Sequence, residues 1–251
     1  MINSIYKQLQ QEAIRIAGKY PAPAFYVDFS GEVSRSMRFF AEDEVVCSLW
    51  RFVSENIEND YGHGLEHVKN VAIDAGAIVL IEAGPFCISR EELDHRVRMA
   101  QAAGLLHDIR RKDKNHAAAG ARYSRQILRD YPFTQPDIDA ICLAISNHEA
   151  FGQNRKGVTP ASDLLSGSLY DADKFRWGPE NFTRTLWAMV SYKEIPFERF
   201  LAHYPEGMAF LKKIRRTFRT PTGRRYGPEF IDLGIAIGED LHEVIREKFQ
   251  S

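Results

Sequence analysis

Cysteine and long hydrophobic runs are both scarce in this sequence. The 251 residues contain three cysteines, Cys47, Cys87 and Cys142, at wide spacings and inside otherwise apolar stretches. An odd number of scattered cysteines argues against a disulfide framework and predicts buried thiols in a reducing compartment. The longest apolar run, around residues 79–81, is far shorter than the roughly 20 residues that span a bilayer. Because the amphipathic N-terminal segment also lacks the apolar core and cleavage site of a secretion signal, we expect a cytoplasmic protein without a membrane segment.

An excess of charge of one sign is also missing. Lys and Arg together number 33, Asp and Glu number 34, and the net charge is -1, so no global field draws the chain to nucleic acid or to a membrane surface. The local exception is segment 212–225, which contains many basic residues and no acidic one. We interpret this segment as a solvated helix face, and the alternative is a patch for a polyanionic substrate or nucleic acid.

Strand pairs, internal repeats and low-complexity tracts are absent, whereas helical periodicity is widespread. Ser89 and Glu92 form a capping-box pattern before one of the periodic stretches. Residues 21–36 contain prolines and a glycine without sustained periodicity and are predicted to be a connector, and residues 220–227 are predicted to be a loop. The fold class is therefore predicted to be all-α, with helices over about residues 1–20, 41–58, 64–84, 90–107, 116–131, 136–148, 159–173, 179–194, 206–219 and 228–248.

Potential metal ligands stand at the ends of four of these predicted helices, on the face expected to point inward. They are His67, the adjacent pair His107 and Asp108, His148, and Asp173. Histidine nitrogen and carboxylate oxygen together suit Zn, Mn, Fe, Co or Ni better than Ca. Adjacent residues on a regular helix point about 100° apart, so His107 and Asp108 can converge on one ion only where the helix ends. The polar stretch that follows them, Arg110 to Lys114, predicts such an end.

Three segments carry a resemblance to a known family. They are GHGLEHVKNVA around His67, AGLLHDIRR around the His107 and Asp108 pair, and LYDADKFRWG around Asp173. This order resembles the HD superfamily of metal-dependent phosphohydrolases over roughly residues 55–190. The resemblance implies an HD-domain helical bundle with additional N- and C-terminal helices. Residues 1–50 would then form an N-terminal helical extension, residues 51–195 the HD metal-binding domain, and residues 196–251 C-terminal helices that pack on the core.

By this resemblance the metal ligands are His67, His107, Asp108 and Asp173. Asp171 competes for the last position, and Asp173 is preferred because the family's aspartate is commonly followed by a pair that resembles Lys174 and Phe175. The ion would be a divalent transition metal, Mn, Fe, Zn, Co or Ni.

Two more histidines bear on whether one ion or two are bound. His116 and His148 resemble positions that supply a second ion in binuclear members of the superfamily. The best-known binuclear pattern has another histidine after the position of His148, where this chain has Glu149. In mononuclear relatives the equivalent histidines line the pocket, where they contact phosphate or move protons. Both stoichiometries therefore stay open.

The implied activity is hydrolysis of a phosphomonoester, phosphodiester or nucleotide by metal-activated water. Catalytic roles fall to Asp108, His116, His148 and Arg111. Further substrate contacts are expected from His63, Arg110, Lys112 and Lys174, although a solvated turn is the alternative interpretation of the basic stretch. Trp177 can either wall the pocket or pack in the core.

Two alternative functions accompany the phosphohydrolase. One is an HD-type di-iron oxygenase, since His116 and His148 would complete a set of four His and two Asp ligands. The other is a catalytically silent regulatory module. The expected partner is a phosphate-containing small molecule or nucleotide, with no membrane and with nucleic acid disfavoured, and the sequence does not predict an oligomeric state.

Overall fold

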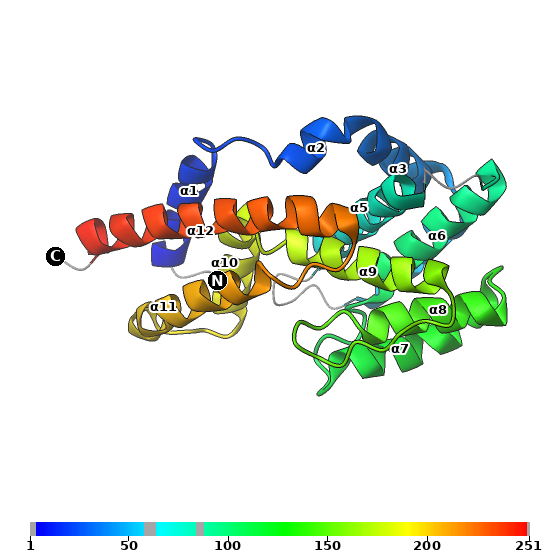
Figure 1. Ribbon diagram of the computed structural model, residues 1–251. Coiled ribbons are helices and arrows are strands. Elements are labelled where there is room, and N and C mark those ends of the chain that lie inside the picture. Colours follow the sequence, from blue (N-terminus) through cyan, green and yellow to red (C-terminus); the bar gives the residue numbers. More distant parts are fainter. Residues whose placement is uncertain (1–3, 58–63, 84–87, 250–251) are drawn as a thin grey trace.

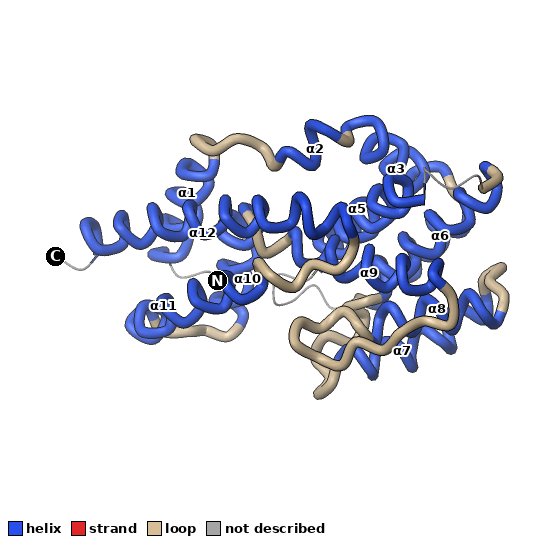
Figure 2. The backbone as a smooth tube through the Cα atoms, viewed as in Figure 1, coloured by secondary structure: helices blue, strands red, loops and turns tan. Residues whose placement is uncertain are grey.

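The computed structural model describes residues 4–57, 64–83 and 88–249, and throughout these residues the regular structure is helical, with no strand (Figures 1 and 2). The predicted all-α class is thereby confirmed. None of the described helices is both long enough and apolar enough to cross a membrane. In chain order the helices are α1 (Ser4–Ala17), α2 (Ala24–Asp28), α3 (Ser30–Glu42), α4 (Glu44–Asn56), α5 (Leu65–Ala83), α6 (Arg90–Leu106), α7 (His116–Ile127), the 3₁₀ turn η1 (Leu128–Asp130), α8 (Gln135–Ser146), α9 (Pro160–Phe175), the π-helix η2 (Asn181–Thr185), α10 (Leu186–Tyr192), α11 (Phe197–Ile214) and α12 (Pro221–Phe249).

Helix α5 lies at the centre of the bundle and packs against α3, α6 and α9 (Figure 1). Its sequence is apolar on nearly every side from Val71 to Leu80, so this part of the helix is buried all round rather than along one stripe. The contact with α6 is close because Gly104 faces Ala72, where a Cβ atom on Gly104 would lie 2.5 Å from the Ala72 Cα atom. The absence of a side chain at Gly104 therefore fixes how near the two helices approach.

Side-chain caps set the start of α8 and of α9. The Thr134 hydroxyl accepts a hydrogen bond from the Asp137 backbone N–H, while the Asp137 carboxylate accepts from the Thr134 N–H. Thr159 and Ser162 form the same reciprocal pair at α9. Each helix also has a proline in its first turn, where the missing N–H removes no helical hydrogen bond. With its start fixed, α9 packs against both α5 and α8 and carries Asp173 into the interior.

Helix α12 runs along α9 and then along α1, so that it connects the centre of the bundle with the layer formed by α1, α10 and α11 (Figure 1). An aromatic cluster holds its first half in place. The rings of Phe175 and Phe230 stack with centroids 4.1 Å apart, and Phe25 from α2 lies 5.1 Å from Phe175. Segments distant in sequence therefore share one part of the core.

The predicted connector at residues 21–36 is wrong, because the segment forms α2 and the first half of α3. The buried face of α3 carries Ser36, whose hydroxyl donates to the Ile73 carbonyl oxygen on α5. A small polar residue fills a position where an apolar one would have produced helical periodicity. The sequence therefore lacks the apolar periodicity that predicts a helix, although α3 forms.

The C-terminal part also differs from expectation. Residues 221–227 belong to the first turns of α12 rather than to a loop. Helix α11 begins at Phe197, ahead of the expected start at 206, and continues through Pro205. The glycines that suggested a loop serve close packing: a Cβ atom on Gly227 would collide with the Phe218 ring. Glycine in this stretch therefore reflects lack of space and not a turn.

Candidate metal centre

Six side chains from the ends of five helices converge inside the bundle. His67 lies in the first turn of α5, His107 and Asp108 directly follow α6, His116 begins α7, His148 follows α8, and Asp173 lies in the last turn of α9. All except His116 are 5% exposed or less. Tight turns after α6, in which the Ile109 N–H donates to the Leu106 carbonyl oxygen, end the helix at the point where both residues of the adjacent pair face inward.

The first group consists of His67, His107 and Asp173. The two Nε2 atoms of the histidines lie 3.2 Å apart, and Asp173 Oδ1 lies 3.4 Å from His67 Nε2 and 3.8 Å from His107 Nε2. Ligand atoms bound about 2.1 Å from one tetrahedral ion are separated by about 3.4 Å. The spacing of the three atoms therefore fits a single transition-metal ion.

The second group consists of Asp108, His116 and His148. Asp108 Oδ1 lies 3.6 Å from His116 Nε2 and 3.5 Å from His148 Nε2, and these two nitrogens are 3.2 Å apart. The other carboxylate oxygen, Oδ2, lies 3.4 Å from His107 Nε2. The Asp108 carboxylate therefore stands between the two groups and presents one oxygen to each.

Hydrogen bonds on the far side of three imidazole rings direct their Nε2 atoms inward. His107 Nδ1 lies 2.7 Å from the Gly104 carbonyl oxygen, and His148 Nδ1 lies 2.7 Å from the carbonyl oxygen three residues before it. His116 Nδ1 lies 2.9 Å from the Glu149 carboxylate. When Nδ1 donates its proton outward, the Nε2 lone pair is available to a metal ion. Glu149, which the sequence presented only as a missing histidine, thus orients His116.

The charge states of two candidate ligands suit metal binding. Burial together with the neighbouring Arg111 guanidinium lowers the pKa of His116 to about 3, so this ring is neutral at neutral pH. Burial opposes ionisation of Asp173, but the Lys174 ammonium and the imidazoles of the first group hold its pKa well below the usual range. A neutral imidazole and an ionised carboxylate are the forms that bind a metal.

The pKa of His107 is shifted in the opposite direction from that of His116. Burial disfavours the charged ring, yet the carboxylates of Asp108 and Asp173 outweigh it and raise the His107 pKa. These carboxylates favour a positive charge near His107. A bound metal cation would supply that charge in place of the proton on the His107 ring.

Arg111 and Lys174 are two basic residues that lie against these candidate ligands. Arg111 Nη1 lies 2.6 Å from His116 Nε2 and 3.5 Å from Asp108 Oδ1, and about a third of its side chain is exposed. The buried Lys174 ammonium binds Asp173 Oδ2, which leaves Oδ1 of that carboxylate facing the two histidines of the first group. Arg111 therefore places a cation at the second group, and Lys174 orients a ligand of the first.

Arg110 and Lys112, two of the other expected substrate contacts, interact with residues outside the six of the cluster. Arg110 pairs with Asp113 at 3.0 Å and stacks on a tyrosine ring, and the Lys112 ammonium lies 5.6 Å from the centroid of the Tyr192 ring on α10. His63 is outside the described residues.

Asp171, the competitor for the last ligand position, does not join the cluster. Its buried carboxylate accepts hydrogen bonds from the Arg219 and Thr220 backbone N–H groups, both at 2.8 Å, and from the Thr220 hydroxyl at 2.7 Å. Burial raises the pKa of Asp171 to about 6 in spite of these bonds. This residue holds the start of α12, and Asp173 is the aspartate that meets the histidines.

Sequence reasoning missed a buried polar network beside the cluster. Arg176, one turn after Asp173, forms an ion pair with Asp74 of α5 and donates to the Tyr26 hydroxyl, and it also pairs with Glu180 at 2.7 Å. Nothing in the sequence marks these residues as partners, because they come from separate helices. The network links α2, α5 and α9 within two helical turns of the candidate ligands.

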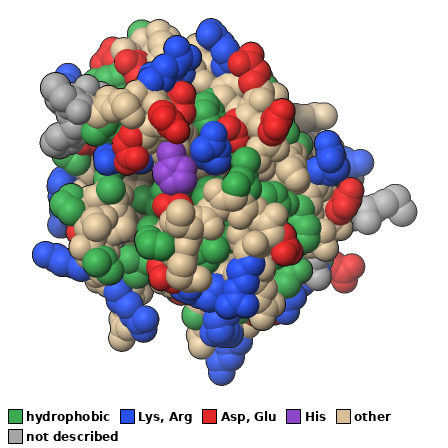
Figure 3. Space-filling model, turned by 90° about the vertical axis from the view of Figure 1, so that its right-hand side faces the viewer, with side chains coloured by type: hydrophobic (Ala, Val, Ile, Leu, Met, Phe, Trp, Pro, Cys, Tyr) green, Lys and Arg blue, Asp and Glu red, His purple; other side chains and the backbone are tan. Residues whose placement is uncertain are grey.

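The basic segment 212–225 is partly neutralised within the fold. Arg215 pairs with Asp232 at 2.6 Å, and Lys212 lies 4.0 Å from Glu239, both acids on α12. On the face drawn in Figure 3, acidic and basic side chains are likewise interspersed.

No protein-family model, no curated protein and no solved structure matches this chain. What the structure establishes is an all-helical protein with two adjoining, largely buried His/Asp groups that can hold metal ions.

Proposed function

We propose that this protein is a metal-dependent phosphohydrolase of the HD type. The observation that carries the proposal is that the four expected ligands converge from three helix ends, with the Arg111 guanidinium 3.5 Å from the Asp108 carboxylate. A buried set of imidazole nitrogens and carboxylate oxygens suits a divalent transition metal, and a guanidinium beside it suits the oxygens of a phosphate.

The ion would be held by the first group together with Asp108 Oδ2. When bound, such a cation lowers the pKa of a coordinated water and neutralises charge on a phosphoryl oxygen. Asp108 Oδ1 can accept a hydrogen bond from a water molecule and so orient it toward a phosphate ester, and His148 Nε2, 3.5 Å from that oxygen, is placed to move the proton. Arg111 would donate to the phosphate oxygens as negative charge develops on them.

His116 has a different part in this proposal from the proton transfer considered in the sequence. A pKa of about 3 makes its ring a poor proton acceptor at neutral pH. The ring stays neutral and is turned inward by Glu149, which suits it to accept a hydrogen bond or to bind an ion.

Arg111 also bears on the number of ions. Its Nη1 atom lies within hydrogen-bonding distance of the nitrogen that His116 would offer to a second ion, so a guanidinium and an ion exclude each other at that atom. We therefore propose one ion in the first group, with Arg111 as the cation of the second. Arg111→Ala is then expected to increase the number of bound ions from one to two while turnover falls.

The test combines elemental analysis with a hydrolysis screen. Purified protein is loaded separately with Mn, Fe, Zn, Co and Ni and assayed on p-nitrophenyl phosphate, bis-p-nitrophenyl phosphate and nucleotides. His107→Ala and Asp108→Ala should lose bound metal and reduce turnover by about a hundredfold or more. His95→Ala, on the same helix but paired with Asp137 outside the cluster, is the matched control and should keep both.

Two outcomes contradict different parts of the proposal. Unchanged metal content in His107→Ala and Asp108→Ala would remove the metal centre. Full metal content with no hydrolysis of any ester would remove the phosphohydrolase and leave a metal-binding module.

The complete set of four histidines and two aspartates favours one second candidate, a di-iron oxygenase. Iron-loaded protein would then consume oxygen and change its visible absorption, and protein loaded with zinc would be inactive. Equal or greater hydrolysis with a redox-inert ion argues for the phosphohydrolase.

A further inference from the structure

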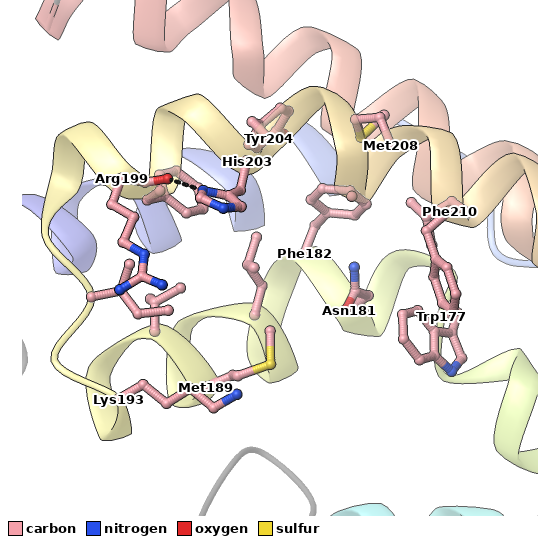
Figure 4. Close-up of a pocket in the computed structure, with 16 residues that line it drawn as sticks. Trp177, Asn181, Phe182, Met189, Lys193, Arg199, His203, Tyr204, Met208 and Phe210 are labelled. Atoms are coloured by element: carbon pink, nitrogen blue, oxygen red, sulfur yellow. Dashed lines mark hydrogen bonds between the residues drawn. The ribbon is translucent and has the colours of Figure 1, made fainter. Parts of the chain in front are cut away.

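A second site is offered by a cavity of about 420 Å³ between η2 and α10 on one side and α11 on the other (Figure 4). None of the six residues of the metal centre lines it. Its volume falls within the roughly 300–1,000 Å³ of small-molecule sites, and its walls are mostly apolar, as in such sites. The cavity is therefore a candidate ligand site in its own right.

The two ends of the cavity differ in chemistry. Arg199 and His203 extend from neighbouring turns of α11 at one end, and Trp177 and Phe210 contact each other at the other end, with ring centroids 5.3 Å apart (Figure 4). Among the described residues that line the cavity there is no Asp or Glu. The wall therefore carries positive charge, from Arg199 and Lys193, and no negative charge.

Hydrogen bonding leaves the cationic end able to receive an acid group. His203 Nδ1 donates to the Arg199 carbonyl oxygen at 2.8 Å, which directs the other ring nitrogen away from the helix backbone. A guanidinium presents paired donors that match the two oxygens of a carboxylate. The Arg199 guanidinium therefore complements a single negative charge at this end of the cavity.

The middle of the cavity is built to accept a flexible apolar chain. Met189 and Met208 line opposite sides of it, and the unbranched thioether side chain adapts to ligands of different shape (Figure 4). Gly207, which also lines the cavity, has room for a larger side chain, since no atom lies within 4 Å of the position its Cβ would take. The adjoining π-helix η2 is of a type found often at functional sites.

We propose that this cavity binds a medium-chain carboxylate, with its acid group at Arg199 and its chain running between the methionines toward Trp177. The proposal does not depend on the hydrolytic function, because the cavity and the metal centre share no residue.

The test is isothermal titration calorimetry of the full chain with three ligands of equal chain length: decanoate, decanol and decylamine. Decanoate should bind with one site per chain, decanol about tenfold or more weakly, and decylamine more weakly still, because a charged hydrogen bond contributes about a tenfold change in affinity or more. Arg199→Gln should weaken decanoate about tenfold and leave decanol unchanged. Lys213→Gln removes another exposed cation of α11 that does not line the cavity, so it should change neither.

A second pair of variants tests the position of the chain. Gly207→Leu places a side chain in the open space of the wall and should abolish binding of decanoate and decanol alike, and Met189→Trp serves the same purpose if the first variant does not fold. Asp108→Ala should bind decanoate normally, which separates this site from the metal centre. The proposal is overturned if decylamine binds as tightly as decanoate, if Arg199→Gln has no effect, or if decanoate shows no saturable binding below its critical micelle concentration.

Discussion

At the scale of single residues, Asp171 and Asp173 lie on the same helix, α9, but have different partners because their side chains point in different directions. Residues two apart on a helix point to nearly opposite sides. Asp171 therefore faces the start of α12, where it accepts three hydrogen bonds, and Asp173 faces the histidines of α5 and α6. The first carboxylate stabilises the fold, and the second is the candidate metal ligand.

Substitution of each aspartate by asparagine should separate these tasks. Asp171→Asn places an amide N–H against backbone donors and should lower the free energy of unfolding by about 1–3 kcal/mol with metal content retained. Asp173→Asn should lose the ion. Stability alone does not distinguish the two, because Asp173→Asn also leaves the buried Lys174 ammonium without its partner. The measurements are metal content by elemental analysis and unfolding in urea; loss of metal from Asp171→Asn would contradict the assignment.

The sequence predicted the identities of the converging residues but not their orientation. Histidine and aspartate at helix ends, in an order that resembles a known family, were enough to select the first group and to prefer Asp173 over Asp171. The bonds from Glu149 to His116 and from Arg111 to both His116 and Asp108 depend on how the turn after α6 meets the turn after α8. Helical periodicity carries no information about such loop geometry.

At the scale of helices, the contact of Gly104 with Ala72 controls the distance between two ligands. His67 lies one turn and a half before Ala72 on α5, and His107 lies three residues after Gly104 on α6, so both histidines depend on how closely these helices pack. A side chain at Gly104 would meet backbone atoms, which cannot rotate away.

We expect Gly104→Ala to destabilise the protein by about 1–3 kcal/mol, as overpacking does, and to weaken metal binding because the two histidines move apart. Gly207→Ala is the matched control: it also lies inside a helix, has open space around it, and should raise stability by about 0.5–1 kcal/mol with metal affinity unchanged. Chemical denaturation and metal titration measure both effects. Equal behaviour of the two variants would show that the close contact does not govern the site.

Helix starts were predicted well where local chemistry marks them and poorly where tertiary contacts decide. The prolines in the first turns of α8 and α9 act locally, and both helices begin within one residue of the predicted starts at 136 and 159. The start of α12 depends on hydrogen bonds to Asp171, about fifty residues earlier in the sequence. It also depends on glycines at positions where neighbouring side chains leave no room for a Cβ atom. A capping residue so far away in the sequence cannot be recognised from local patterns, and the glycines led to the prediction of a loop.

At the scale of the whole molecule, the candidate ligands of the first group together with Asp108 join α5, α6 and α9, which otherwise meet through apolar packing, with the Arg176 network as a further link between α5 and α9. An ion that binds only the folded chain stabilises it by mass action. At a free concentration of about one hundred times its dissociation constant, the gain is about 2.7 kcal/mol, which for a chain of this size raises Tm by about 5–10 °C.

Chelation should therefore lower Tm by this amount, and addition of the preferred ion should restore it. The measurement is calorimetry or thermal shift on matched samples. His107→Ala is expected to unfold at the same temperature with and without added ion. If chelation removes the metal and Tm of the wild-type chain does not change, the ion does not connect these helices.

The spread of the ligands along the polypeptide bears on when the centre can be filled. His67 leaves the ribosome first, the pair at 107 and 108 follows, and Asp173 emerges only when α9 is nearly complete. A growing chain therefore offers an incomplete set of donors for much of its synthesis. Metal supply in the cell would act on finished or nearly finished polypeptides, and loading would be a late event in biosynthesis.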